Sequence, residues 1–178
     1  YSGLSFYQRK EIKDAIAYMR LVVNPNDEEA LKRVVNYPAR GIGNTTMGKI
    51  QMAATKAGVS LWEVICNPSF YNTSIGTATT SKLGAFRSLV TCFKDKAEGE
   101  DAFTLTRSLL AESGMMKDIY EGKDAEDVAR QENIDEFLNS IMMFVDTRRE
   151  EQDSPSVSVA DFLQEVALLT DLVSDDGE

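Results

Sequence analysis

Apolar residues recur along this chain at intervals of three and four, the spacing that places them on one face of an α-helix. The first such stripe runs from Ile12 to Val23 and predicts a helix over residues 8–23. The same periodicity predicts further helices over 27–37, 47–57, 60–66, 79–96, 102–112, 114–121, 125–149 and 158–172. No stretch of five or more residues alternates as a half-buried strand does. We therefore expect an all-α protein, a folded-back array of about eight or nine helices in a single domain over residues 1–178.

Several helix ends carry recognisable capping residues. Asn26 is expected to be an N-cap, because three acids follow it near the positive end of the helix dipole. Ser60 is expected to cap the helix after it, and Ser158, or the residue before it, the last helix. Gly58 suits the left-handed position that ends a helix. The polar run 153–156 predicts a break before the last helix.

Composition excludes several kinds of chemistry. The 178 residues contain no histidine, which removes the commonest general base, imidazole zinc sites and the Ser-His and Cys-His nucleophile pairs. Two cysteines, Cys66 and Cys92, lack a C-x-x-C spacing, and we expect buried structural thiols in a reducing, cytoplasmic protein. No apolar run approaches the roughly 18–20 residues of a membrane span, so no membrane partner is expected. Because the chain begins with Tyr1, we expect it to be a fragment.

Charge is distributed unevenly along a chain whose net charge is −10. Residues 30–94 contain eight basic residues and a single acid, Glu63, whereas residues 95–178 contain seven basic and 23 acidic residues. An acid-poor segment can present a phosphate-binding face even on an acidic protein, because exposed charges act over roughly 10 Å. Alternatively, the acids are simply concentrated on the surfaces of the C-terminal helices.

A glycine-rich turn lies inside the acid-poor segment. It reads Arg40, Gly41, Ile42, Gly43, Asn44, Thr45 and Thr46, and Lys49 follows one turn into the next helix. The glycines allow a tight turn and close backbone approach, Ile42 can insert into the core, and the helix N-terminus offers N–H groups to an anion. This arrangement resembles a helix-hairpin-helix that grips a duplex by its phosphates without reading sequence. The alternative is that the turn joins two helices for geometric reasons only.

Other motifs carry less information. A second loop, residues 75–82, repeats the arrangement with one glycine, and a plain turn with a threonine N-cap is the expectation there. Acidic pairs such as Asp135 with Glu136 are expected to be solvated rather than to form a metal or acid–base site. The sequence has no G-x-x-x-x-G-K-[ST] phosphate loop, so we expect no ATP hydrolysis by this chain and no cofactor bound to it.

Three consecutive N-terminal segments carry a family resemblance: residues 3–14, 17–27 and 33–43 look like the start of subdomain 2B in UvrD/PcrA/Rep-type superfamily 1 ATP-dependent DNA helicases. The segment 130–138 is similar to the family's Arg-x-Glu-Asn-Leu-x-Glu motif, and 160–171 to its closing helix. Residues 66–125 match only in pattern. In that family, subdomain 2B is an all-helical insertion into the second RecA-like domain, and it swivels to regulate unwinding.

The resemblance implies a role for the glycine turn. It implies that Gly41, Ile42 and Gly43, with their neighbours, contact double-stranded DNA, and that the remaining motor domains of a 3′–5′ helicase, which bind ATP and Mg, are partners together with repair proteins. It also implies that the two chain ends lie close together, as in an insertion. The alternative function left open is a protein-interaction module that docks partner proteins or those motor domains.

Overall fold

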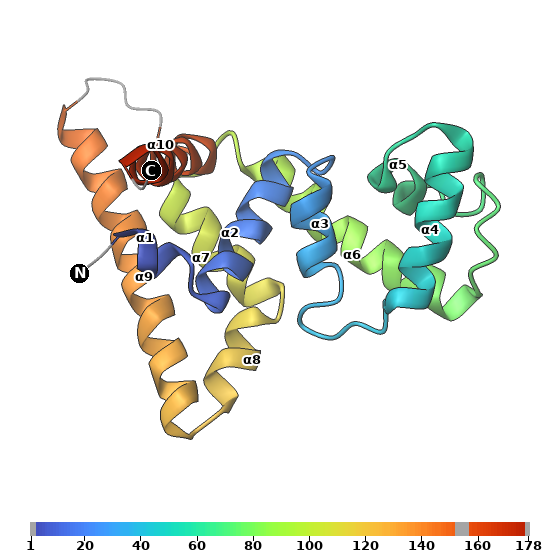
Figure 1. Cartoon of the computed structure of the whole chain (residues 1–178), viewed down its shortest axis with the longest axis horizontal. Coiled ribbons are helices and arrows are strands. Elements are labelled where there is room, and N and C mark those ends of the chain that lie inside the picture. The colour runs from blue at the N-terminus through green and yellow to red at the C-terminus, as the bar shows by residue number, and fades with distance from the viewer. Residues whose placement is uncertain (1–2, 152–156, 177–178) are drawn as a thin grey trace.

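The computed structural model describes residues 3–151 and 157–176 and is all-α, with no strand in those ranges (Figure 1). It contains ten helices within them: α1 (Gly3–Tyr7), α2 (Lys10–Val23), α3 (Glu28–Val34), α4 (Asn44–Ala57), α5 (Leu61–Cys66), α6 (Thr77–Lys96), α7 (Ala102–Glu112), α8 (Met115–Glu121), α9 (Ala125–Glu151) and α10 (Val159–Asp176). The nine helices expected from periodicity are confirmed, and the short α1 is an addition. The predicted break at 153–156 lies outside the described residues.

The capping predictions are confirmed in part. Ser60 accepts a hydrogen bond from the Glu63 N–H, Ser158 accepts one from the Asp161 N–H, and Gly58 ends α4 in the left-handed conformation at φ 66°. The N-cap of α3 is Asp27 rather than Asn26, because the Asp27 carboxylate reaches the Ala30 N–H at 3.1 Å.

Helix α2 is the centre of the larger part of the fold. It packs against α3, α6, α7, α9 and α10, and nine of its 14 residues are buried. Its five other residues recur at intervals of three and four and form one exposed or partly exposed stripe, so the helix buries all but one face: Lys10, Lys13, Ile16, Arg20 and Val23. Its largest fully buried side chains are Tyr18, Ile12, Met19 and Leu21.

The smaller part of the fold lies at the opposite end from α9 and α10 in Figure 1. We call residues 44–76 the α4–α5 lobe, because α4 and α5 pack against each other and bury Ile50, Leu61 and Ile65 between them and the rest of the core. Helix α6 packs against α5 and also against α2 and α7, so it runs from this lobe into the larger part. Glu28 adds a second connection, since its Oε2 accepts a hydrogen bond from the Leu61 N–H at 2.9 Å.

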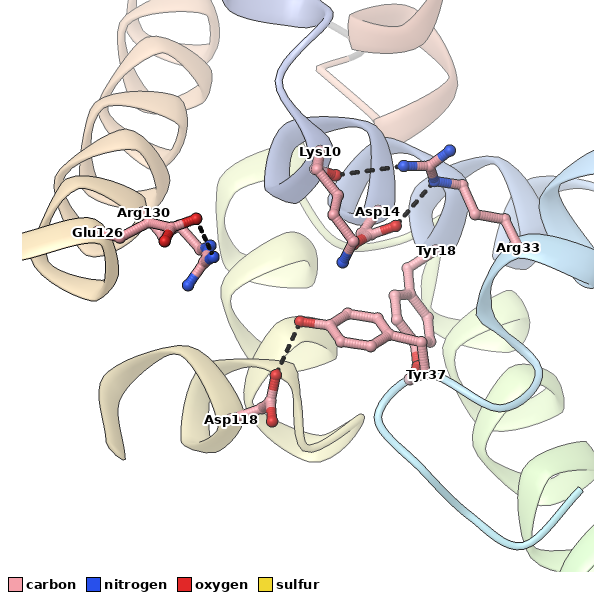
Figure 2. Close-up of polar contacts among 8 residues, drawn as sticks. All are labelled: Lys10, Asp14, Tyr18, Arg33, Tyr37, Asp118, Glu126 and Arg130. Atoms are coloured by element: carbon pink, nitrogen blue, oxygen red, sulfur yellow. Dashed lines mark hydrogen bonds and ion pairs between the residues drawn. The ribbon is translucent and has the colours of Figure 1, made fainter. Parts of the chain in front are cut away.

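A buried acid joins α2 to α3. Asp14 is 3% exposed and accepts hydrogen bonds from Arg33, at 2.7 Å, and from Lys10, at 3.2 Å. Figure 2 shows that the Tyr37 ring lies nearby and that its hydroxyl donates to Asp118 of α8 at 3.1 Å. Burial and the Asp118 carboxylate raise the pKa of Tyr37, so the hydroxyl keeps its proton. The loop after α3 is thereby held against α8.

The first and last helices are neighbours, since α1 packs against α10. The expectation that the chain ends lie close together concerns residues 1–2 and 177–178, which are outside the described residues. Cys66 is partly buried, which raises the pKa of its thiol, but Cys92 is exposed, so the expectation of two buried thiols was wrong for Cys92. Among the described residues, no helix is both long enough and apolar enough to cross a membrane.

Candidate nucleic-acid interface

The turn before α4 is fixed by its own side chains. The Asn36 carboxamide oxygen accepts hydrogen bonds from the backbone N–H groups of Arg40, at 2.8 Å, and Ile42, at 3.1 Å. Ile42 is 1% exposed and belongs to the core, as its position between the two glycines predicted. Its side chain therefore anchors the turn, and its backbone N–H is already bonded to Asn36.

Gly41 is required by its backbone conformation. Its φ of +79° lies in the left-handed region that side chains disfavour, and a Cβ there would stand 2.7 Å from Nζ of Lys82. The Lys82 side chain of α6 thus lies over the glycine turn. This contact joins the glycine turn to the first turns of α6, 41 residues away along the chain.

Arg40 points into the protein. Its guanidinium donates to the carbonyl oxygens of Val34, Val35, Tyr37 and Ser113, at 2.8–3.2 Å, and to the Tyr18 hydroxyl, at 2.5 Å. It also lies 5.0 Å from the centroid of the Phe86 ring. Burial raises the pKa of Tyr18, although Arg40 opposes this, and the protonated hydroxyl donates to the Tyr37 carbonyl. Arg40 thus stabilises the loop that follows α3. Its guanidinium could contact a phosphate only if these hydrogen bonds broke.

Gly43 differs from Gly41 because nothing inside the fold requires a glycine there. Its backbone is extended (φ −87°, ψ −172°), and a Cβ would meet no atom within 4 Å. It occupies the N-cap of α4 without supplying a side-chain acceptor to the first-turn N–H groups of Asn44, Thr45 and Thr46. Serine, asparagine or aspartate would cap the helix better. The N-terminus of α4 is therefore an open end with positive dipole character.

Lys49 links this open end to the second loop. Its side chain is exposed, and Nζ donates to the Ser74 carbonyl oxygen at 3.1 Å. Helix α6 begins at Thr77 with Gly76 as its N-cap, so the threonine cap expected there was wrong; Thr80 instead donates its hydroxyl to the Gly76 carbonyl at 3.0 Å. Two lysines thus connect the glycine turn with the second loop and α6, Lys49 through the Ser74 carbonyl and Lys82 over Gly41.

The charged residues around the N-terminus of α4 favour binding of an anion. Glu63, the one acid between residues 30 and 94, accepts hydrogen bonds from the Asn67 amide at 3.2 Å and the Tyr71 hydroxyl at 3.1 Å. Lys49 and Lys82 are exposed, whereas Arg33 is paired with Asp14. The acid-poor segment therefore does present exposed cations, Lys49 in the α4–α5 lobe and Lys82 next to it in α6, although fewer than its sequence suggested.

Sequence reasoning missed two residues that build this site. Asn36 organises the turn, and an asparagine at the start of a loop is a known signal for such side-chain to backbone bonds. Lys82 covers Gly41, and no sequence signal could have paired them. Within the described ranges, no group of three or more His, Cys, Asp or Glu side chains is arranged to hold a metal ion.

Comparison with known proteins identifies the family of this chain. Residues 1–176 match the model of the UvrD-like helicase C-terminal domain, and the chain belongs to that family. Among individual proteins, it is 36% identical over 170 residues to the ATP-dependent DNA helicase PcrA of Leuconostoc citreum and 35% identical over 170 residues to PcrA of Bacillus subtilis. It is 29% identical over 168 residues to DNA helicase II of Escherichia coli.

These matches cover 94–96% of the chain but only 22–23% of each relative. The chain therefore spans about a quarter of the length of the curated relatives it matches.

Proposed function

We propose that this chain is a non-catalytic, duplex-DNA-binding and regulatory module of an ATP-dependent 3′–5′ DNA helicase. It corresponds to subdomain 2B, a single helical domain inserted into the second RecA-like domain. Two things support this: the chain's family, and the open N-terminus of α4, where Gly43 leaves room for a close partner beside exposed Lys49. The second of these is the observation that carries the proposal.

The proposed ligand is the phosphate backbone of double-stranded DNA. The N–H groups of Asn44, Thr45 and Thr46 point along the helix dipole toward the proposed phosphate. Gly43 lets the DNA approach the backbone, and Lys49 adds a cation. Because these groups touch no base edge, duplexes of different sequence should bind alike. Arg40 and Ile42 hold the turn in place from inside.

The remaining parts of the helicase supply the chemistry. The residues of this chain include no phosphate-cradling loop, so ATP and Mg are assigned to the motor domains outside it. Those motor domains are the first protein partners, with DNA-repair proteins as further ones. A DNA helicase of this kind works in the cytoplasm.

Fluorescence anisotropy with a labelled duplex at low salt tests the proposal. Binding of the wild-type chain should fall in the range of about 10⁻⁴–10⁻⁶ M that non-specific phosphate contacts give. Gly43→Asp, which caps the helix with its own carboxylate, and Lys49→Glu should both weaken it. Lys94→Glu is the matched control, because Lys94 is exposed near the C-terminal end of α6, about 18 Å along the helix axis from Lys82. If all three variants bind like the wild type, the turn is structural and the module docks proteins instead.

A further inference from the structure

A groove runs between α4 and the loop that connects α5 to α6. It has a volume of about 890 Å³ and is bordered by Lys49, Met52 and Lys56 on the helix and by residues 70–74 on the loop. None of the residues that line it is acidic. On a chain of net charge −10, such a surface is complementary to a negatively charged ligand.

Two large apolar side chains stand exposed at this groove. Phe70 is 77% exposed and Met52 is 74% exposed, and neither contributes to the hydrophobic core. Met52 lies between Lys49 and Lys56 on one face of α4, since the three follow each other at intervals of three and four residues. The two lysines are about 10 Å apart along the helix axis, which leaves space for a nucleoside between them.

The loop is built to hold Phe70 at the rim of the groove. The Phe70 ring packs edge-on against Tyr71, with centroids 4.9 Å apart, and Tyr71 is tied to Glu63 by its hydroxyl. The Thr73 hydroxyl donates to the Pro68 carbonyl at 3.1 Å, which closes the loop on itself. The ring is thus held in an exposed position instead of folding onto the core.

We propose that this groove binds a single-stranded segment of DNA, with a base against Phe70 and Met52 and phosphates near Lys49 and Lys56. A cationic groove with an exposed aromatic ring is the composition with which proteins bind single strands, because every base offers a flat face for stacking. The groove starts at Lys49, so it continues the duplex surface, and the inference rests on the proposed function. The ligand is then a junction, with the duplex at the α4 N-terminus and the unpaired strand along α4.

The test compares a blunt duplex with the same duplex carrying a single-stranded thymidine tail of about ten nucleotides. In anisotropy titrations of the whole chain, the tail should raise affinity. Phe70→Ala should remove about fivefold to a hundredfold of the affinity for the tailed duplex and leave the blunt duplex unchanged. Lys56→Glu should act in the same direction.

Two further variants test whether the effect depends on an aromatic ring at position 70. Met143→Ala removes another side chain that is 67% exposed, on α9, and should change neither affinity. Phe70→Trp should keep the tail's effect, and the added tryptophan emission should be quenched by the tail. The affinity for the blunt duplex, and its loss in Gly43→Asp, test the proposed function independently of the tail.

Three results would overturn the inference. One is a tail that adds no affinity to the wild type, and another is a Phe70→Ala variant that loses blunt and tailed duplex equally, which would make Phe70 a duplex contact. The third is a Phe70→Ala variant that binds the blunt and the tailed duplex as the wild type does, which would show that Phe70 contacts neither DNA.

Discussion

Arg40 and Ser113 are joined by a hydrogen bond of 3.1 Å from the Arg40 guanidinium to the Ser113 carbonyl oxygen, across 73 residues of sequence. The bond links the turn before α4 to the junction of α7 and α8. Together with the Lys82 side chain over Gly41, it fixes the glycine turn relative to the larger part of the fold. The position of the candidate DNA surface is therefore determined by contacts within the chain.

Removing the Arg40 guanidinium should destabilise the fold. Arg40→Met leaves several carbonyl oxygens without their charged donor, and we expect the free energy of unfolding to fall by about 2–4 kcal/mol. Lys49→Gln, which removes an exposed cation, should change it by less than about 1 kcal/mol. Urea unfolding midpoints of the two variants measure the difference. Equal midpoints would show that the Arg40 network contributes nothing to stability.

The two glycines of the turn should respond differently to substitution. Gly41→Ala forces a side chain into the left-handed region and displaces Lys82, so we expect a loss of about 1 kcal/mol or more. Gly43→Asp keeps an allowed backbone and adds an N-cap acceptor, so stability should stay level or rise by about a few tenths of a kcal/mol. Thermal unfolding measures both, and a clear loss for Gly43→Asp would contradict the open space seen there.

Glu28 should matter more than its neighbour Glu29. Glu28→Ala leaves the Leu61 N–H without its acceptor and loosens the α4–α5 lobe, at an expected cost of about 1–3 kcal/mol. Glu29 is 86% exposed and meets Arg20 at 3.6 Å, so Glu29→Ala should cost about 0.5 kcal/mol or less. Hydrogen exchange of the α5 amides should accelerate only in the Glu28 variant. Acceleration in both, or in neither, would contradict this assignment.

Asp101, the N-cap of α7, should make stability depend on acid pH. Partial burial alone would raise its pKa, but hydrogen bonds from Thr104 and the charge of Arg149 lower it below its ordinary value of 3.8. A lowered pKa means that the carboxylate's contribution is complete above pH 3.8 and is lost as the pH falls through the folded-state value. The difference in the free energy of unfolding between the wild type and Asp101→Asn should therefore decrease as the pH is lowered. A gap that widens in acid would refute this sign.

Sequence periodicity predicted most of the fold because the core positions of α2, α6 and α9 recur at helical spacing. It missed α1, which spans only five residues, too few to show a period. The N-cap at Ser60 was predicted correctly, because the side chain bonds within its own turn. The N-cap of α3 was predicted one residue too early, at Asn26, because Asp27 competes for the same N–H groups.

The candidate site was predicted less completely, because its residues meet across long sequence separations. The burial of Ile42 followed from its place between two glycines, but the inward direction of Arg40 depends on Tyr18 and Ser113, which lie 22 and 73 residues away. The exposure of Phe70 is likewise invisible in a sequence where apolar residues are expected inside. Charge counts alone also overstated the cationic surface, since Arg33 is neutralised by Asp14.

The salt dependence of duplex binding tests the central proposal most directly, because each phosphate neutralised by a cation contributes about −0.9 to the slope of log affinity against log salt concentration. The wild-type chain should show a steep negative slope with duplexes of unrelated sequence. Lys49→Gln should make the slope shallower by about 0.9, and Lys94→Gln, at the far end of α6, should leave it unchanged. A slope that is flat in the wild type, or unaltered by Lys49→Gln, would contradict a phosphate-binding surface at the N-terminus of α4.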